Sequence, residues 1–467
     1  MTTSTAGAGQ RSMESLGRVH FIGIGGVGMS AVARIMVARG VPVTGSDAKD
    51  LPVMADLAAA GAGIHVGYAA GNVGAAQTVV AGSAIRADNP ELQAARDAGL
   101  PVLHRSEALA AAMAGDRVVT VAGTHGKSTT TSMITVLLQR AGLDPTFAIG
   151  ANVPALGVNA ASGTSDVFVA EADESDGSFL NYRPNIAVVT NVEPDHLDYY
   201  GTAEAVYQSF DRFTELLPAD GVLVACADDA GARALAERTG ARGNTRVVTY
   251  GTAEDSLLRL HDGGPGDVWV STPAGRYALE LQVPGRHNAL NAAAAFAVAL
   301  ELGVAPEAAA SALAHFSGAS RRFEFKGEGR GVRVYDDYAH HPTEVRAALS
   351  AARSVAGDHK VHVLFQPHLF SRTREFAAEF AEALNAADSA LVLDIYPARE
   401  DPIPGVSSEL IADRLSTGGR LVAAEDAVPA IVANAAPGDI VLTAGAGDVT
   451  AYGPLIVQAL LAEAPGG

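Results

Sequence analysis

Short apolar runs alternate with longer amphipathic stretches along most of the chain. Runs such as Val19 to Ile24, Val118 to Ala122 and Ile186 to Thr190 are β-branched and four to six residues long, and they read as strands buried on both faces. Helical stretches such as Met29 to Arg39 and Ala203 to Leu217 stand between such runs. This alternation predicts parallel sheets covered by helices, so the fold class is α/β.

The same alternation restarts in the last third of the chain. Apolar strands are predicted at Val332 to Tyr335, Val361 to Gln366, Ala390 to Leu393 and Ile440 to Leu442. By contrast, residues 240 to 280 are expected to be irregular, with alternating segments such as Val268 to Val270 that look antiparallel. At 467 residues the chain is too long for a single core, which favours several domains.

Two glycine loops follow two of the predicted strands. Gly23 to Gly28 has the spacing G-x-G-x-x-G between a strand and a helix, with Asp47 close to where a ribose-binding acid belongs. Alone, this motif would favour an NAD-dependent dehydrogenase, although any pyrophosphate can bind at that helix N-terminus. The second loop, Gly123 to Gly126, leads into Lys127 and Ser128 at the start of a helix.

The second loop has the order of a phosphate-binding loop. Backbone N–H groups would face the anion, Lys127 would reach the β- and γ-phosphates, and the Ser128 hydroxyl would bind Mg²⁺. Acidic residues follow two nearby strands, at Glu171 to Asp176 and at Glu193 to Asp198. Because one acid could complete a Mg²⁺ shell, these runs favour metal and phosphate chemistry over a solvated loop.

The composition of the chain disfavours several classes of binding partner and indicates a compartment. The chain carries 52 acidic and 33 basic residues, a net charge of −19, which disfavours nucleic acid and anionic membranes as partners. No apolar run reaches the length of a membrane span, and the N-terminus lacks the core of a signal peptide. A single cysteine, Cys226, suits a reducing compartment, so we expect a cytoplasmic protein. The sequence does not indicate an oligomeric state.

Eight segments together resemble the Mur ligases, the ATP-dependent ligases of peptidoglycan-precursor synthesis. They are HFIGIGGVGMS, GTHGKST, AEADESD, TNVEPDHLD, PGRHNALN, GASRRFE, DDYAHHPTE and QPHLFSRT, in that order along nearly the whole chain. The His within GTHGKST resembles the branch that adds the first amino acid. The resemblance implies a Rossmann-like domain for a UDP-sugar, a P-loop-type central ATPase domain with a parallel sheet, and a Rossmann-like C-terminal domain closing on ATP and amino acid. The expected boundaries are a disordered tail at 1–16 and domains at 17–115, 116–325 and 326–467.

The implied reaction joins L-alanine to the lactyl carboxylate of UDP-N-acetylmuramate through an acyl phosphate, with ATP as substrate and two Mg²⁺ ions. By the resemblance, the catalytic residues are Lys127, His196, His340 and Arg372. ATP would be bound by Gly123, Thr124, His125, Gly126, Lys127, Ser128, Thr129, His287, Asn288, Asn291, Arg322 and Asp337. The UDP-sugar would be bound by Gly25, Gly26, Val27, Gly28, Asp47 and Ser83, and the amino acid by Tyr338, His340 and Arg372. Metal ligands would be Ser128, Glu171 and His196.

Two departures from sibling ligases bear on the branch. No lysine occurs between Lys127 and Lys326, so the carbamylated lysine of several siblings cannot form in the central domain. Leu369 stands where many members of the alanine-adding branch have arginine, so any contact made by that arginine is absent here or supplied by another residue. The alternatives are a recycling ligase that attaches a murein peptide to the same UDP-sugar, an NAD-dependent oxidoreductase, and a nucleotide sensor without catalysis.

Overall fold

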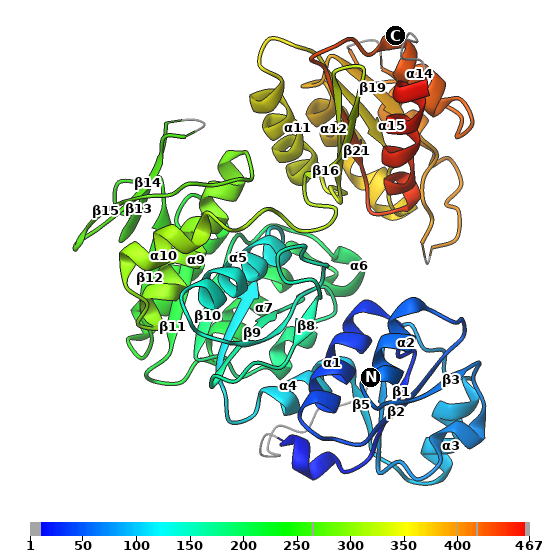
Figure 1. The fold of residues 1–467 in the computed structure, drawn as a ribbon, viewed down its shortest axis with the longest axis vertical. Helices are drawn as coiled ribbons and strands as arrows, with labels where there is room; N and C mark the ends of the chain where they lie inside the picture. Colours follow the sequence, from blue (N-terminus) through cyan, green and yellow to red (C-terminus); the bar gives the residue numbers. More distant parts are fainter. Residues whose placement is uncertain (1–10, 264–265, 399, 417–418, 463–467) are drawn as a thin grey trace. The chain divides into compact units, whose positions relative to one another are not determined.

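The computed structural model describes residues 11–467 except 264–265, 399, 417–418 and 463–467. The chain forms three sheets and two compact units, one of residues 1–280 and 290–316 and one of residues 281–289 and 317–467. Each unit is described by itself. The α/β fold class with parallel sheets is confirmed (Figure 1).

The first sheet is five-stranded and parallel, in the order β3-β2-β1-β4-β5. Helix α1 contacts both α2 and α4, while α3 packs with the 3-10 helix η2 (Figure 1). The elements are η1 Met13–Leu16, β1 Val19–Ile22, α1 Val27–Ala38, β2 Val43–Asp47, α2 Pro52–Ala59, β3 Gly63–Val66, η2 Ala70–Val73, β4 Thr78–Ala81, α3 Pro90–Asp97, β5 Val102–His104 and α4 Arg105–Met113.

The N-terminal tail is shorter than expected. Residues 1–10 lie outside the described residues, but Met13–Leu16 form a 3-10 helix and Leu16 is buried. The prediction of a disordered tail through residue 16 is therefore wrong for its last turn, because the apolar Leu16 side chain is buried against the domain.

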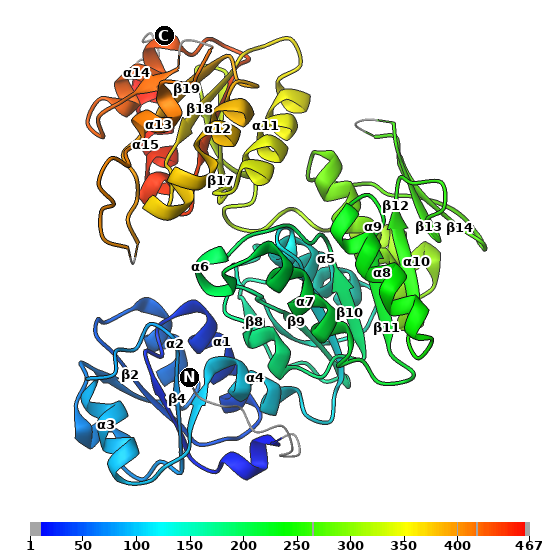
Figure 2. The same ribbon diagram turned by 180° about the vertical axis from the view of Figure 1, so that it is seen from behind.

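The second sheet has ten strands, in the order β15-β14-β13-β12-β11-β10-β6-β9-β7-β8. Helices α5 and α10 pack together, and α7 packs with α8; Figure 2 shows α7 and α8 from behind. The elements are β6 Arg117–Ala122, α5 Lys127–Arg140, β7 Thr146–Ala148, β8 Ala160–Ala161, β9 Val167–Glu171, η3 Ser178–Asn181, β10 Ile186–Val189, α6 Leu197–Tyr200, α7 Ala203–Thr214, β11 Val222–Cys226, α8 Ala230–Arg242, β12 Arg246–Gly251, β13 Leu258–Asp262, β14 Val268–Thr272, β15 Gly275–Ala278, α9 Arg286–Glu301 and α10 Pro306–Leu313.

Residues 240 to 280 are more regular than predicted. Strand β12 pairs parallel to β11, and β13, β14 and β15 form an antiparallel extension of the sheet. The expectation of an irregular segment is wrong, whereas the antiparallel pairing is confirmed. In β13 the buried Leu258 and Leu260 alternate with more exposed residues, β14 has one buried residue, Val270, and β15 has none, so no continuous apolar run marks these strands.

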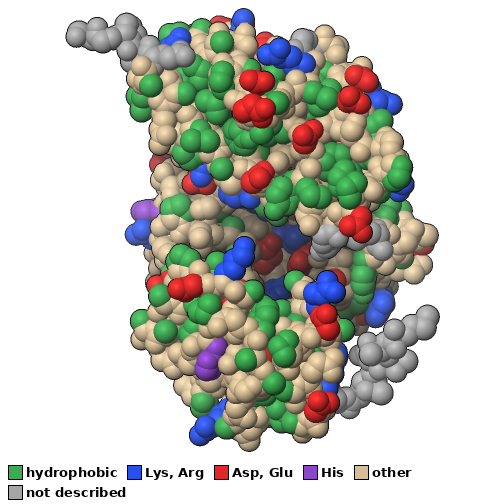
Figure 3. All heavy atoms as spheres, turned by 90° about the vertical axis from the view of Figure 1, so that its right-hand side faces the viewer, with side chains coloured by type: hydrophobic (Ala, Val, Ile, Leu, Met, Phe, Trp, Pro, Cys, Tyr) green, Lys and Arg blue, Asp and Glu red, His purple; other side chains and the backbone are tan. Residues whose placement is uncertain are grey.

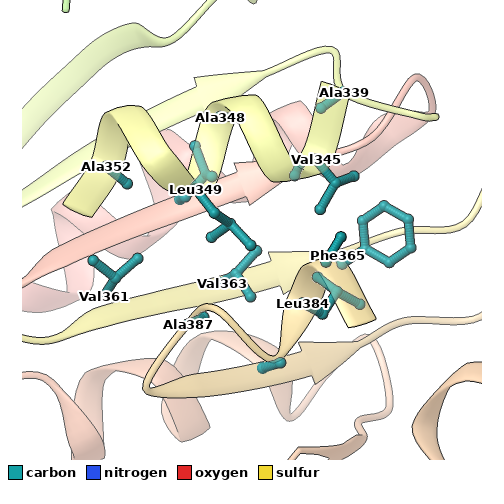
Figure 4. Close-up of a cluster of buried hydrophobic side chains, with 14 of the residues drawn as sticks. Ala339, Val345, Ala348, Leu349, Ala352, Val361, Val363, Phe365, Leu384 and Ala387 are labelled. Carbon is teal, nitrogen blue, oxygen red and sulfur yellow. The ribbon is translucent and has the colours of Figure 1, made fainter. Parts of the chain in front are cut away.

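The third sheet has six strands, in the order β16-β17-β21-β18-β19-β20. Helices α11 and α12 cover a core that includes Leu349, Val363 and Phe365, drawn in Figure 4. A second core on α14 and α15 includes Ile431 and Ile456. The elements are β16 Glu324–Gly329, β17 Val332–Asp337, α11 Pro342–Ala356, β18 Val361–Phe365, α12 Phe370–Leu384, β19 Ser389–Val392, α13 Glu409–Ala412, β20 Arg420–Leu421, α14 Ala427–Asn434, β21 Ile440–Ala444, η4 Asp448–Ala451 and α15 Tyr452–Ala462.

Figure 3 shows acidic and basic side chains spread over the same face rather than gathered by sign. Among the described residues, no helix has the length and apolarity needed to cross a membrane.

Candidate active site

The Gly123 loop connects β6 to α5 by a turn that requires glycine. Gly123 has φ of 134°, and a Cβ there would lie 2.1 Å from the hydroxyl oxygen of Thr190. Gly126 is left-handed, with φ of 82°, and precedes α5 without a side-chain cap. The first N–H groups of the helix thus have no capping side chain, the arrangement that binds phosphate.

Lys127 folds back over this loop. Its Nζ donates to the carbonyl oxygens of Gly123 at 2.7 Å and Thr124 at 3.1 Å, and to Glu174 at 2.9 Å. Glu174 is 2% exposed, so the pair is shielded from water. The side chain predicted to bind the β- and γ-phosphates is therefore held by the loop and by one buried carboxylate.

The pKa values of Lys127 and Glu174 are both raised, which favours a charged lysine and opposes a charged glutamate. Burial opposes the charge of Lys127, but the carboxylates of Glu174 and Asp173 overcome it and raise its pKa. Burial raises the pKa of Glu174 to about 7, against the effect of Lys127. We assign a charged ammonium, because its three acceptors surround Nζ at hydrogen-bonding distance.

Ser128 and Glu171 lie together at the start of α5. The Ser128 hydroxyl donates to Oε1 of Glu171 at 3.0 Å, and Oε2 accepts the N–H of Gly150 at 2.8 Å. The hydroxyl oxygen of Ser128 on α5 and the carboxylate of Glu171 at the end of β9 thus lie close together, as oxygen ligands of Mg²⁺ do. Both residues were predicted as metal ligands, and that role stays a prediction.

A second loop, Thr190 to Glu193, is hydrogen-bonded to the Gly123 loop. The Asn191 side chain accepts the N–H of His125 at 2.7 Å and donates to its carbonyl at 3.1 Å, while the Thr190 hydroxyl donates to the same carbonyl at 2.6 Å. Thr124 and Glu193 exchange hydrogen bonds through the Thr124 hydroxyl. Sequence reasoning singled out neither Thr190 nor Asn191; their position at the end of β10 was the available signal.

His196 lies beside the acidic residues of this region. It has a left-handed backbone with φ of 55°, and its Nε2 is 3.6 Å from Asp195 and 3.9 Å from Glu174. Through Glu174, His196 is brought close to Lys127. Glu174 was not among the predicted site residues, although it stands in the AEADESD segment.

The N-terminal glycine loop, Gly23 to Gly28, is hydrogen-bonded to the carboxylate of Asp47. Asp47 accepts the N–H of Gly25 at 3.0 Å, so these two predicted residues contact each other. Gly26 caps α1, whose first residue Val27 is 55% exposed. Ser83 is exposed at the end of β4, where its hydroxyl lies 3.1 Å from Nε2 of His104.

In the second unit, Asp337 is anchored at the end of β17. Its two carboxylate oxygens accept the N–H groups of Phe323 and Ala339, both at 2.8 Å. Burial raises the pKa of Asp337 to about 7, against the opposing charge of Arg322. Burial, with Arg322 second, lowers the pKa of His287 to about 4. Three predicted ATP-binding residues thus share one neighbourhood.

The predicted amino-acid residues gather at the same strand ends. Tyr338 and His340 pack edge to face at 5.0 Å, and His340 Nδ1 lies 2.9 Å from the carbonyl of Tyr338. Arg372 is 7% exposed in the first turn of α12. Leu369 precedes this helix with φ of 69° and is 8% exposed, so its side chain is buried, unlike a charged one that reaches a ligand.

The asparagines of the PGRHNALN segment differ in their contacts. Asn288 donates to the carbonyl of Pro284 at 2.7 Å, a local bond at the start of α9. Asn291 lies against the phosphate loop, since a Cβ on Gly126 would be 2.9 Å from its Oδ1. Thr129 is 7% exposed in the first turn of α5. Asn291 is therefore better placed for nucleotide contact than Asn288.

The raised pKa of Asp337 predicts a pH dependence of stability. With a pKa of about 7 in the fold and an ordinary value of 3.8, the carboxyl binds protons more tightly when folded. Stability from this group is present at low pH and is lost as pH rises from about 4 to 7, by about 4 kcal/mol at most. Thermal unfolding of wild type and Asp337→Asn should diverge as pH rises from 4 to 8, the wild type losing more. Parallel curves would contradict this.

Comparison with known proteins gives full-length matches. Residues 18–117, 121–299 and 321–447 match family models described as "Mur ligase family, catalytic domain", "Mur ligase middle domain" and "Mur ligase, glutamate ligase domain". The UDP-N-acetylmuramate–L-alanine ligase of Arthrobacter sp. strain FB24 is 92% identical over 467 residues, covering 100% of both chains.

Solved structures agree with this likeness. The UDP-N-acetylmuramate–alanine ligase of Thermotoga maritima matches with a TM-score of 0.77 and 29% identity, covering 96% of this chain and 100% of that one. A murein peptide ligase of Psychrobacter arcticus matches with a TM-score of 0.69 and 26% identity, covering 96% and 99%.

Proposed function

This chain belongs to the Mur ligase family, and on that premise we propose that it makes a peptidoglycan precursor. It joins L-alanine to the lactyl carboxylate of UDP-N-acetylmuramate with ATP, and releases ADP and phosphate. The observation that carries this conclusion is the 92% identity, over the whole length of both chains, with a curated ligase of that activity. Because ATP and a sugar nucleotide are its substrates, we propose the cytoplasm as its compartment.

The chemistry accounts for the phosphate loop. A carboxylate is a poor acyl donor, so the γ-phosphate of ATP is first transferred to one carboxylate oxygen. The amine of alanine then attacks the acyl carbon, the amide bond forms, and phosphate leaves with that oxygen. Bringing two anions together needs positive charge between them, and Lys127 with the N–H groups of α5 supplies it.

We propose that Mg²⁺ is held by Ser128 and Glu171, with His196 as ligand of a second ion. The oxygen donors of Ser128 and Glu171 lie 3.0 Å apart and fit a hard cation. Bound Mg²⁺ would neutralise charge on the phosphates. His196 stands beside two acidic residues, which fits a site for a cation.

The remaining predicted residues serve the three substrates. The loop from Gly25 to Gly28 takes the diphosphate of the UDP-sugar, and Asp337 with Arg322 takes the ribose side of ATP. Tyr338, His340 and Arg372 face the amino acid. No arginine stands at Leu369, so the carboxylate of alanine is bound by the cation of Arg372, which is buried in the first turn of α12.

The recycling ligase is the closest alternative, because a murein peptide ligase shares the fold over 96% of this chain. Phosphate release with UDP-N-acetylmuramate plus L-alanine or plus the tripeptide separates the two. We expect release with alanine and little with the tripeptide. Release only with the tripeptide would favour recycling, and reduction of NAD without phosphate release would favour an oxidoreductase.

An isotope experiment tests the acyl phosphate directly. With the lactyl carboxylate labelled with ¹⁸O, the released inorganic phosphate should carry one label per turnover, and only when alanine completes the reaction. The measurement is mass spectrometry of the phosphate. Label in AMP would indicate adenylation instead, and label kept wholly in the product would exclude phosphoryl activation.

A further inference from the structure

Arg39 lies at the opposite end of α1 from the N-terminal glycine loop. The helix runs from Val27 to Ala38, and Arg39 is its C-terminal cap residue. At a rise of about 1.5 Å per residue, about 18 Å separates the two ends of this helix. The Arg39 side chain is 18% exposed, and none of the roles proposed above uses it. Any effect of Arg39 on a ligand of the glycine loop must therefore pass along α1.

The Arg39 guanidinium joins elements of the first sheet to the edge of the second. Its Nη1 donates to the carbonyl of Ala112 on α4 at 2.7 Å, and its Nη2 donates to Asp116 at 2.7 Å. On the side of the second sheet, Nη2 donates to Thr146 at 2.8 Å and Nε donates to Ser162 at 3.3 Å. All three guanidinium nitrogens are thus hydrogen-bonded, which fixes the planar group in one orientation.

The acceptors of the second sheet belong to strands that lead to the ATP site. Thr146 is buried at the start of β7, and β7 pairs with β9, which ends at Glu171. The guanidinium also lies over the ring of Phe168 on β9, at 5.6 Å from its centroid. At the other end of α1, the Asn159 side chain donates to the carbonyl of Val27 at 3.2 Å. Helix α1 is therefore attached at both ends to the part of the second sheet that holds Glu171.

We propose that Arg39 is a positioning residue for phosphoryl transfer, an inference that rests on the proposed function. The lactyl carboxylate belongs to a substrate bound at the start of α1, whereas the γ-phosphate is bound at the start of α5. Transfer requires the reacting atoms to lie about 3 to 3.5 Å apart and in line. By fixing α1 to β7, to β9 and to the residue after β8, Arg39 sets this separation without touching either substrate.

The test compares Arg39→Gln with wild type in substrate affinity and in turnover. By calorimetry, the affinities for UDP-N-acetylmuramate and for ATP should each stay within about twofold of wild type, because neither binding loop is changed. The kcat for phosphate release with alanine should fall by about 10- to 100-fold, the loss expected when reacting groups are misplaced by about 1 Å. An unchanged kcat would overturn the proposal, as would a loss of either affinity as large as the loss of kcat.

The matched control is an arginine of the same helix. Arg34 pairs with Asp56 of α2 at 3.7 Å, a contact that stays beside the first sheet. Arg34→Gln should therefore leave kcat and both affinities at their wild-type values. If Arg34→Gln lowers kcat as much as Arg39→Gln does, then α1 responds to the loss of any of its charges, and the proposal is wrong.

A double variant separates positioning from a general loss of stability. Asp116→Asn keeps the shape of the side chain and removes the charge that pairs with Arg39. If the two residues act through one contact, the double variant should have about the kcat of Arg39→Gln alone, because coupled losses do not add. Losses that multiply would overturn the proposal. Turnover is measured at a temperature at which thermal unfolding shows every variant to be folded.

Failure of this inference can be told apart from failure of the proposed function. Wild-type protein that releases no phosphate with UDP-N-acetylmuramate, ATP and alanine would contradict the proposed function, and this inference with it. Phosphate release by wild type together with an unaffected Arg39→Gln variant would contradict only the role of Arg39.

Discussion

Lys127→Ala is expected to lower kcat by about 1,000-fold or more, with the affinity for UDP-N-acetylmuramate nearly unchanged. The ammonium contacts the loop carbonyls and Glu174, and its proposed role is to stabilise the charge that moves between phosphates. Since that charge is greatest in the transition state, the loss should appear in kcat. Phosphate release and calorimetry measure the two quantities.

The control for this variant is another lysine of the same chain. Lys360→Ala removes an exposed charge in the second unit and should leave both kcat and sugar affinity intact. Removing Lys127 also leaves buried Glu174 without its cation, so thermal unfolding must be followed in parallel. Equal loss of kcat and of UDP-N-acetylmuramate affinity would mean that the loops are misassigned or that the variant is misfolded.

Glu171→Gln is expected to lower kcat by on the order of 100-fold and to raise the Mg²⁺ concentration needed for half-maximal activity. The substitution keeps the shape of the side chain and can still accept from Gly150 or Ser128. It removes the negative charge that a divalent cation requires from its ligand. Activity measured over a range of Mg²⁺ concentrations should show partial recovery at high concentration.

An exposed glutamate provides the comparison. Glu237→Gln on α8 removes the same charge from the surface of the same unit, and its Mg²⁺ dependence should match wild type. If Glu171→Gln lowers kcat at every Mg²⁺ concentration by the same factor, then Glu171 acts by holding Gly150 and the surrounding loop, and the metal assignment is wrong.

Much of the fold follows from local sequence because its strands are apolar on both faces. The strand predicted at Ile186 to Thr190 is found at Ile186–Val189, and the helix predicted to start at Lys127 continues to Arg140. Of the antiparallel strands β13 to β15, only part of β14, Val268 to Val270, was indicated by the sequence. Few residues of these strands are buried, and the pairing that makes them strands comes from neighbours rather than from an apolar run.

The site residues also fall into two groups, those that could be identified from the sequence and those that could not. Gly123 to Ser128 could be identified because the loop, its lysine and its helix are consecutive in the sequence. Glu174 and Asn191 could not, because each acts on the loop from 47 or 66 residues away along the chain. Long-range contacts of this kind are not visible in the spacing of residues.

The two hydrogen bonds between the Asn191 side chain and the backbone of His125 limit which residues can stand at position 191. The Asn191 side-chain amide bonds to the main chain of residue 125, not to its side chain: it accepts from the N–H and donates to the carbonyl. An aspartate at 191 would keep the first bond and set a carboxylate oxygen against the carbonyl. The backbone shape of the loop therefore depends on the side chain at position 191 more than on the side chain at position 125. Substitutions at residue 191 should therefore impair growth even where His125 is kept, and deep mutational scanning of growth would measure that loss.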